Sequence, residues 1–364
     1  MTGTVLLIFP FCLGAIIGSF LNVCIYRLPR GMKVNHPRRS FCPSCNTQIS
    51  WTENLPLFSW LLLRGKCSVC GATIPFRYFV VEFLTAVLFM LCWVWFGWPL
   101  AIVYWLFIAL MITATFIDFE HLIIPDEITI GGTLAGLILS AILPQMMGAE
   151  THLAGFVYSL IGALSGFALL WAVVEMGKIA FGKKRHQFDE TESFTIRIAE
   201  NANVLVLQGE EVPWEDIFSR PTDELVWECS TFEIHSQSGV VRSETGNLRM
   251  RHDCIFLSGE EIALTDVVQI QGQASAVTMP REAMGFGDVK FIAAIGAFLG
   301  WKAVLFTVFA AAFLGLVAGG GIFLFSGGKK GGRIPFGPYL ALGGLLWLFV
   351  GNAFLDWYIG LLTR

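Results

Sequence analysis

Long apolar runs separated by short polar segments make up most of this chain. A membrane-spanning helix needs about 20 consecutive apolar residues, and seven runs approach that length: 5–26, 79–98, 99–117, 128–147, 153–181, 301–326 and 338–360. An eighth run, 289–300, would be about 18 Å long as a helix, too short to cross a hydrocarbon core of about 30 Å. The pattern predicts an all-α polytopic membrane protein with about eight transmembrane helices, one of them short.

One segment departs from this pattern. From residue 193 to residue 276, short runs alternate apolar and polar positions with Gly and Asn between them, which is typical of strands. The clearest of these runs are Phe194–Ile198, Asn203–Leu207, Phe232–His235 and Cys254–Leu257. We therefore expect a small β-rich soluble insertion over 183–282, in which neither a catalytic triad nor a phosphate-binding loop is visible.

Composition agrees with a membrane protein, because 55% of the residues are hydrophobic, 14% are charged and the mean hydropathy is +0.66. The overall charge of −4 hides an asymmetry, since residues 187–282 carry 18 acidic and 6 basic residues, a net charge of −12, against +8 elsewhere. The acidic surface either binds a basic partner or keeps the insertion soluble. Nothing in the sequence indicates a nucleic-acid partner.

Basic residues predict the orientation in the membrane. Arg27, Arg30, Lys33, Arg38 and Arg39 follow the first apolar run, which places the N-terminus outside and residue 27 onward in the cytoplasm. The cytoplasmic segments are then 27–77, 118–127, 183–290 and 327–337, and 22 of the 24 basic residues fall on that side when Lys178, at the end of the preceding apolar run, is included. The first run lacks a preceding basic stretch and a small-residue cleavage site, so we expect it to remain as a helix.

Two cysteine pairs carry the strongest local signal. Cys42 and Cys45 form one CxxC pair, and Cys67 and Cys70 form a second pair 21 residues later. This spacing is typical of a tetrahedral zinc site of the ribbon type, which stabilises a segment too small for a hydrophobic core. Two disulfides are the alternative, but they are rare in a reducing cytoplasm. We expect a structural zinc domain at 27–77, because four thiolates leave no open position for water.

Two aspartates lie at the edges of apolar runs. Asp288 follows Gly285 and Gly287 at the start of the short run, and Asp118 ends the run 99–117. A charged side chain at membrane depth costs roughly 3 kcal/mol or more and usually carries function. The two glycines allow non-helical backbone beside a cavity. Two carboxylates brought together can act as proton acceptor and donor, which is aspartic-protease chemistry.

The first apolar run contains small and polar residues at helical spacing. Gly14 and Gly18 allow another helix to approach closely, and Asn22 is expected to hydrogen-bond across to that neighbour. Glu82 lies one turn inside the second run and is either functional or a structural partner of Asn22 or Arg77.

Charged residues near the aspartates have simpler interpretations. Asp126 follows Pro125 and precedes an apolar run, which is the position of a helix N-cap. Lys290 is expected to extend its ammonium to the interface. A flexible basic loop, 327–333, leads into a rigid turn with Gly337 and Pro338, which we expect to border the active site.

Taken together, the motifs resemble one family, the bacterial type IV prepilin peptidases. The resemblance rests on Gly18–Val23, Tyr26–Pro29, the two CxxC pairs, Asn54–Pro56, Ser59–Trp60, Arg64–Cys67, Arg77–Tyr78 with Glu82, Asp118 with Ile124–Asp126, Arg281–Lys290 and Phe336–Pro338. It covers nearly everything outside 183–280. A lone GxGD motif would be weak, because presenilin-like proteases also carry it. The long acidic insertion departs from the common pattern.

The resemblance implies an enzyme of the bacterial inner membrane. It implies that Asp118 and Asp288 cleave the basic leader of prepilins or pseudopilins on the cytoplasmic side, with Gly285, Gly287, Glu82, Gly337 and Pro338 near the substrate. It also implies S-adenosylmethionine-dependent methylation of the new N-terminus by the region 27–82. Two rivals remain: a proton-coupled transporter, for which no internal repeat is visible, and a non-catalytic pilus scaffold.

Overall fold

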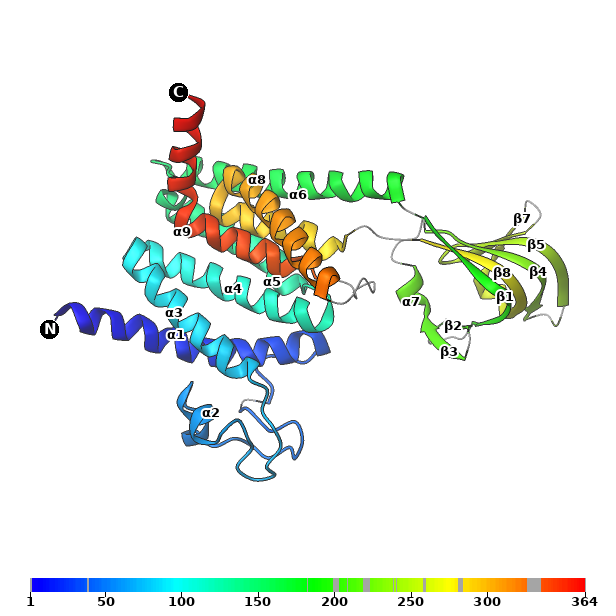
Figure 1. The fold of residues 1–364 in the computed structure, drawn as a ribbon, viewed down its shortest axis with the longest axis horizontal. Helices are drawn as coiled ribbons and strands as arrows, with labels where there is room; N and C mark the ends of the chain where they lie inside the picture. The colour runs from blue at the N-terminus through cyan, green and yellow to red at the C-terminus, as the bar shows by residue number, and fades with distance from the viewer. Residues whose placement is uncertain are drawn as a thin grey trace. The chain divides into compact units, whose positions relative to one another are not determined.

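A computed structural model describes residues 2–37, 39–181, 183–198, 203–207, 209–218, 223–237, 239, 241–257, 260–280, 284–325 and 335–363. The chain divides into two compact units, Met1–Ala172 with Met284–Arg364, and Val173–Ala283. The first contains the four cysteines and the apolar helices except the end of α6 after Ala172, and the second contains the sheet (Figure 1). The predicted basic loop 327–333 lies outside the described residues.

The apolar runs form helices with nearly the predicted limits. They are α1 (Thr2–Arg27), α3 (Arg77–Phe96), α4 (Leu100–His121), α5 (Asp126–Ile142), α6 (His152–Phe181), α8 (Phe286–Phe325) and α9 (Gly337–Leu362). Among the described residues, five helices are long and apolar enough to cross a membrane, or six if the bent α9 counts as one span. This criterion does not reach the expected eight, because α5 has 17 residues and α8 counts once although Gly300 breaks it.

The break at Gly300 creates the short helix that the sequence predicts. Gly300 has a φ of 80° and a ψ of 173°, a conformation that side-chain-bearing residues rarely adopt. The half of α8 before it is enclosed by neighbours: Phe291, Ile295 and Phe298 are fully buried. The hydroxyl of Ser159 in α6 donates to the Ala297 carbonyl at 2.6 Å. A helix too short to span the membrane is thus stabilised by the helices around it.

Helices α1 and α3 pack at very short distance, as the small residues of the first run predict. A Cβ atom added to Gly14 would lie 2.7 Å from Ala86 Cα, and one added to Gly18 would lie 2.7 Å from Glu82 Cα. Asn22 Nδ2 donates to the Tyr78 carbonyl at 3.0 Å. The predicted close helix contact and the predicted cross-helix hydrogen bond are both confirmed.

The cysteine segment between α1 and α3 has little regular structure. It contains the 3₁₀ turns η1 (Leu28–Arg30) and η2 (Thr52–Asn54), the short helix α2 (Phe58–Leu62), and two bridges that each close one CxxC loop. Arg27, 3% exposed, stabilises the entry to this segment. Its guanidinium donates to the carbonyls of Val34 at 2.6 Å and Pro37 at 2.9 Å.

The second unit is one antiparallel eight-stranded sheet in the order β3-β2-β1-β8-β4-β5-β6-β7 (Figure 1). The strands are β1 (Lys183–Arg197), β2 (Val204–Leu207), β3 (Glu210–Pro213), β4 (Leu225–Ser236), β5 (Val241–Met250), β6 (Cys254–Leu257), β7 (Glu260–Ala263) and β8 (Val267–Pro280). The short elements α7 (Trp214–Ile217), η3 (Pro144–Met147) and η4 (Leu264–Asp266) complete the chain.

All four predicted strand segments coincide with strands to within one residue, namely β1, β2, β4 and β6; Ile198 and Asn203 lie just outside. The core of the sheet includes Phe194 and Trp227, whose rings stack 4.1 Å apart. The sequence did not reveal β5, because most of its side chains are exposed and its residues show no alternation. The strand conformation of β5 is stabilised instead by its backbone pairing with β4.

Candidate active site and metal centre

Asp118 lies near the C-terminal end of α4, where Leu122 ends the helix in a left-handed conformation. Its side chain is 5% exposed. The backbone N–H of Gly337, the first residue of α9, donates to Asp118 Oδ2 at 2.9 Å. A carboxylate held by a buried N–H has a defined orientation.

Asp288 lies in the first turn of α8 and is 8% exposed. Its backbone N–H donates to the Gly285 carbonyl at 3.2 Å, which forms the turn that begins the helix. Its carboxylate is close enough to that of Asp118 for the two charges to interact. The fold therefore brings together two buried carboxylates from distant parts of the chain.

Ile124 and two glycines surround this pair. Ile124 is 7% exposed, and a Cβ added to Gly287 would touch it at 3.5 Å. A Cβ added to Gly337 would lie 2.6 Å from Asp118 Oδ2, so a larger residue there would displace the carboxylate. Gly337 and Pro338 are buried, and Gly337 contacts Asp118 directly. The expectation of non-helical backbone was wrong for Gly287, which lies inside α8, whereas Gly285 precedes the helix and is exposed.

Asp126 and Lys290 form an ion pair that the sequence did not predict. Lys290 Nζ lies 2.7 Å from Asp126 Oδ1, and their side chains are 28% and 59% exposed. The N-cap of α5 is Pro125, and no side chain among the described residues caps it. The prediction of a capping Asp126 was therefore wrong, because Asp126 pairs instead with a residue of another helix, which local sequence does not show.

Glu82 lies apart from the contacts around the two aspartates. Its Oε2 accepts the backbone N–H of Leu57 at 2.7 Å. Neither expected partner is used, because Asn22 donates to Tyr78 and Arg77 pairs with Glu120. The contact with Leu57 joins α3 to the cysteine segment.

The four cysteines meet in one cluster. The Sγ atoms of Cys42, Cys45, Cys67 and Cys70 all lie within 4.8 Å of one another, and those of Cys42 and Cys70 are 3.8 Å apart. Hydrogen bonds with Thr47 lower the pKa of the Cys45 thiol from 9.0 to about 6, which favours the thiolate that a metal binds. Four sulfur donors converging on one point are the ligand set that a tetrahedral zinc ion takes, so the residues fit the metal.

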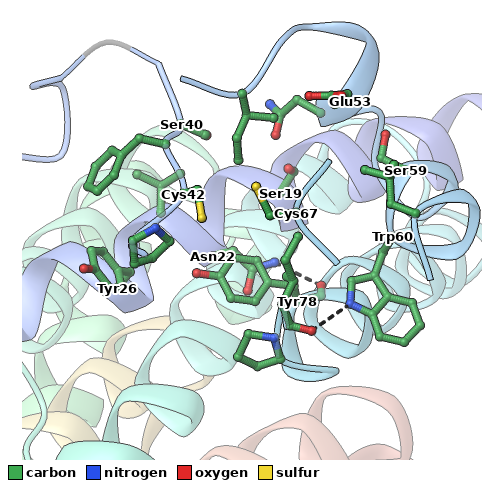
Figure 2. A pocket seen from close by; sticks show the side chains of 18 of the residues that line it. Ser19, Asn22, Tyr26, Ser40, Cys42, Glu53, Ser59, Trp60, Cys67 and Tyr78 are labelled. Atoms are coloured by element: carbon green, nitrogen blue, oxygen red, sulfur yellow. Dashed lines mark hydrogen bonds between the residues drawn. The ribbon is translucent and has the colours of Figure 1, made fainter. Parts of the chain in front are cut away.

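A pocket of about 360 Å³ lies between the cysteine segment and helices α1 and α3. Its lining includes Ser19, Asn22 and Tyr78 (Figure 2). Glu82 also lines it. The sequence showed each residue separately but not the pocket, because the two helices and the cysteine segment form it together. The only available signal was the polar spacing of Ser19 and Asn22 within an apolar run.

Comparisons with known proteins give one match for the part of the chain with the cysteine segment and another for the part with the two aspartates. Residues 12–96 match the bacterial peptidase A24 N-terminal domain, and residues 105–183 and 258–320 match the type IV leader peptidase family. Asp118 and Asp288 fall in the second match and the four cysteines in the first. The residues from 184 to 257 are unmatched, consistent with an insertion.

Similar curated proteins include two named prepilin leader peptidase/N-methyltransferase. The one from Aeromonas hydrophila is 27% identical over 97% of this chain and 93% of its own length, and the one from Myxococcus xanthus is 42% identical over 45% of this chain and 47% of its own. A protein from Escherichia coli, named type 4 prepilin-like proteins leader peptide-processing enzyme, is 36% identical over 46% of this chain and 69% of its own. No solved structure matched.

Proposed function

The chain belongs to the type IV leader peptidase family, and we propose that Asp118 and Asp288 together cleave the peptide bond. It is an enzyme that processes the leader peptides of prepilins, as its relatives' names describe. One observation carries the assignment of the pair: two buried carboxylates at the ends of separate helices lie on either side of Ile124, which adjoins Gly337 beside Asp118 and Gly287 beside Asp288.

The proposed chemistry needs the two groups in opposite protonation states. One carboxylate accepts a proton from the attacking water, and the other donates a proton to the carbonyl oxygen or the leaving amine. Gly337 positions Asp118 through its N–H, and Ile124 fills the space beside both helix ends. Burial excludes bulk water, which strengthens these electrostatic interactions.

The position of the pair fits a prepilin or type II secretion pseudopilin substrate, whose cut site borders its own membrane helix. We propose a multi-pass protein of the bacterial inner membrane with eight membrane helices, α8 contributing two, and with both aspartates at the cytoplasmic surface. A basic leader would meet the exposed Glu127, whereas Glu120 is already paired with Arg77. The acidic insertion, 183–282, is a further candidate contact for the leader.

The relatives' names include a second activity, N-methyltransferase. We propose that the region 27–82 supports it and that the four cysteines hold a structural zinc ion in a ribbon-like domain. S-adenosylmethionine would supply the methyl group to the new N-terminal amine. The four thiolates would leave zinc no open position for water, so its role is to stabilise the segment.

Co-expression with a candidate prepilin tests the whole proposal. Mass spectrometry of the pilin N-terminus should show a leader-free product, with a mass increase of one methyl group if the transferase is active. Asp118→Asn and Asp288→Asn should each lower cleavage by roughly 10⁴-fold, as for residues that act as one unit. Normal cleavage by either variant would remove that aspartate from the mechanism, and an uncleaved pilin with the wild-type protein would favour the scaffold or the transporter.

A further inference from the structure

The soluble insertion contains an internal repeat. Residues 203–217 and 253–267 align without a gap, and Leu, Gly, Glu, Glu and Asp recur at the same positions in both segments. Each segment forms a hairpin followed by a short helical turn, namely β2, β3 and α7 in the first and β6, β7 and η4 in the second. The pairing registers agree, because Leu205 pairs with Val212 and, 50 residues later, Ile255 pairs with Ile262. Such self-similarity indicates a repeated structural unit.

The repeat gives the sheet an approximate two-fold symmetry. Its strand order reads the same from either end when β1, β2, β3 and β4 are matched with β5, β6, β7 and β8. The central strands obey the same rule, since Trp227 pairs with Val277 and Phe232 pairs with Gly272. Gly272 lies 45 residues after Trp227, and Val277 lies 45 residues after Phe232, so the two pairs exchange. The edge strands β3 and β7 therefore occupy equivalent positions (Figure 1).

The edge of β7 presents backbone groups to the outside of the sheet. Antiparallel pairs alternate between hydrogen-bonded pairs and pairs whose N–H and C=O groups point away from the partner strand. The Leu264 N–H donates to the Asp253 carbonyl at 2.8 Å, so the next pair, Ala263 with Cys254, is one that points away. By the same alternation, Glu261 also points outward. Because β7 is the outermost strand of the described sheet, these groups are available to an added strand.

The equivalent edge of β3 is blocked. The Trp214 N–H donates to the Asn203 carbonyl at 3.0 Å, which places Pro213 in the outward position that Ala263 has in β7. Proline lacks an N–H and is a usual means of preventing strand addition at an edge. The backbone does not explain the difference, since φ and ψ are −60° and 144° at Pro213 and −65° and 137° at Ala263. Only the edge of β7 is therefore open along its length.

Charge indicates which partner fits this edge. Glu260 and Glu261 are exposed on β7, and residues 187–282 carry a net charge of −12. A second copy of the chain would bring an equally acidic edge, and like charges directly opposite each other destabilise a strand pair. A basic polypeptide carries the complementary charge. Under the proposed function, the substrate itself has a basic leader.

We propose that the edge of β7 binds the basic leader of the substrate as an added strand, through the outward backbone groups of Glu261 and Ala263. The exposed Glu260 and Glu261 attract its basic side chains. This inference rests on the proposed function and gives the insertion a role in substrate capture. In strand addition the backbone hydrogen bonds supply affinity for any extended segment, so leaders of different sequence can share the site.

The repeat supplies its own test variant. Ala263→Pro copies into β7 the residue that β3 has at the equivalent position, and the φ of −65° at Ala263 already suits proline. Pro213→Ala is the reciprocal control on the other edge. Full-length protein in detergent is titrated with a fluorescent synthetic peptide of the leader alone, followed by anisotropy, and each variant is also assayed for cleavage of the intact prepilin. Circular dichroism and Tm check that the variants are folded.

We expect Ala263→Pro to weaken binding of the leader peptide by about tenfold, because it removes one backbone donor and places a ring against the added strand. The KM for prepilin cleavage should rise by a similar factor with kcat unchanged, as when uniform binding is lost. Pro213→Ala should not weaken either quantity. A second variant, Glu260→Lys, should weaken binding by about threefold at low salt and less at high salt, whereas Glu210→Lys on the blocked edge should have a much smaller effect.

Unchanged affinity and KM in folded Ala263→Pro would overturn the inference. So would a wild-type protein that does not bind the leader peptide, or one that binds equally well a peptide with every Lys and Arg replaced by Gln. A concentration-dependent dimer in light scattering that Ala263→Pro abolishes would assign the edge to a second copy instead. The proposed function is judged separately: cleavage with an unchanged KM removes only the docking site, whereas leader binding at β7 without any cleavage by the wild-type protein removes only the peptidase assignment.

Discussion

Gly337→Ala tests whether the contact between α9 and Asp118 positions the catalytic group. The added Cβ would lie 2.6 Å from Asp118 Oδ2 and 2.9 Å from Ile124 Cδ1. Ordinary contacts of such atoms begin near 3.4 Å, so the carboxylate must retreat by about 0.8 Å or α9 must shift. Either movement stretches the 2.9 Å hydrogen bond from the Gly337 N–H.

The expected magnitude follows from that geometry. A misplacement of about 1 Å costs roughly 10²-fold in rate, and losing a hydrogen bond to a charged group costs about 1.5–3 kcal/mol, which is about 10-fold to 100-fold. We therefore expect Gly337→Ala to lower kcat/KM for prepilin cleavage by about 100-fold. Overpacking should also cost about 1–3 kcal/mol of stability, visible as a lower Tm.

The assay compares cleavage rates of one prepilin by purified variants in detergent, followed by mass spectrometry. Gly360→Ala is the matched control on the same helix, because an added Cβ there meets no atom of the described residues within 4 Å, and it should retain wild-type activity. Gly285→Ala tests specificity within the site, since its Cβ would touch Asp288 Oδ2 only at 3.7 Å. It should cost far less than Gly337→Ala. Wild-type cleavage by folded Gly337→Ala would refute the positioning role.

Three further predictions concern stability and the metal. Elemental analysis should find one zinc ion per chain, and Cys45→Ser should reduce that ratio and lower the Tm; full occupancy in the variant would contradict the four-cysteine site. A double-mutant cycle on Lys290→Ala and Asp126→Ala should give a coupling free energy of unfolding of about 0.5–1 kcal/mol that falls with salt, because the pair is partly exposed. A coupling free energy of zero would show that the contact contributes nothing to stability. Gly18→Ala should destabilise the protein by about 1–3 kcal/mol, because its Cβ would lie 2.7 Å from the α3 backbone. Gly131→Ala should be neutral in the same unfolding measurement, because no atom in the described part of the chain lies within 4 Å of the added Cβ.

Local patterns predicted many features of this molecule. Apolar runs located the long helices, because burial in lipid or among helices selects the same residue types over 20 positions. Alternation located strands β1, β2, β4 and β6. The spacing of the two CxxC pairs predicted that four thiols would meet, and the sulfurs do lie within 4.8 Å of one another. Each of these predictions rests on residues that are close in sequence or on a motif that occurs twice.

The partners of individual polar groups were decided only by the tertiary structure. Nothing near Lys290 in the sequence indicates Asp126, and nothing near Glu82 indicates the Leu57 N–H. The Gly337 N–H reaches Asp118 because α9 begins where α4 ends. Such a hydrogen bond depends on the relative position of two segments that are far apart in the sequence, and residue type alone does not specify that position. The sequence by itself determined which side chains are chemically active, and packing decided what each of them faces.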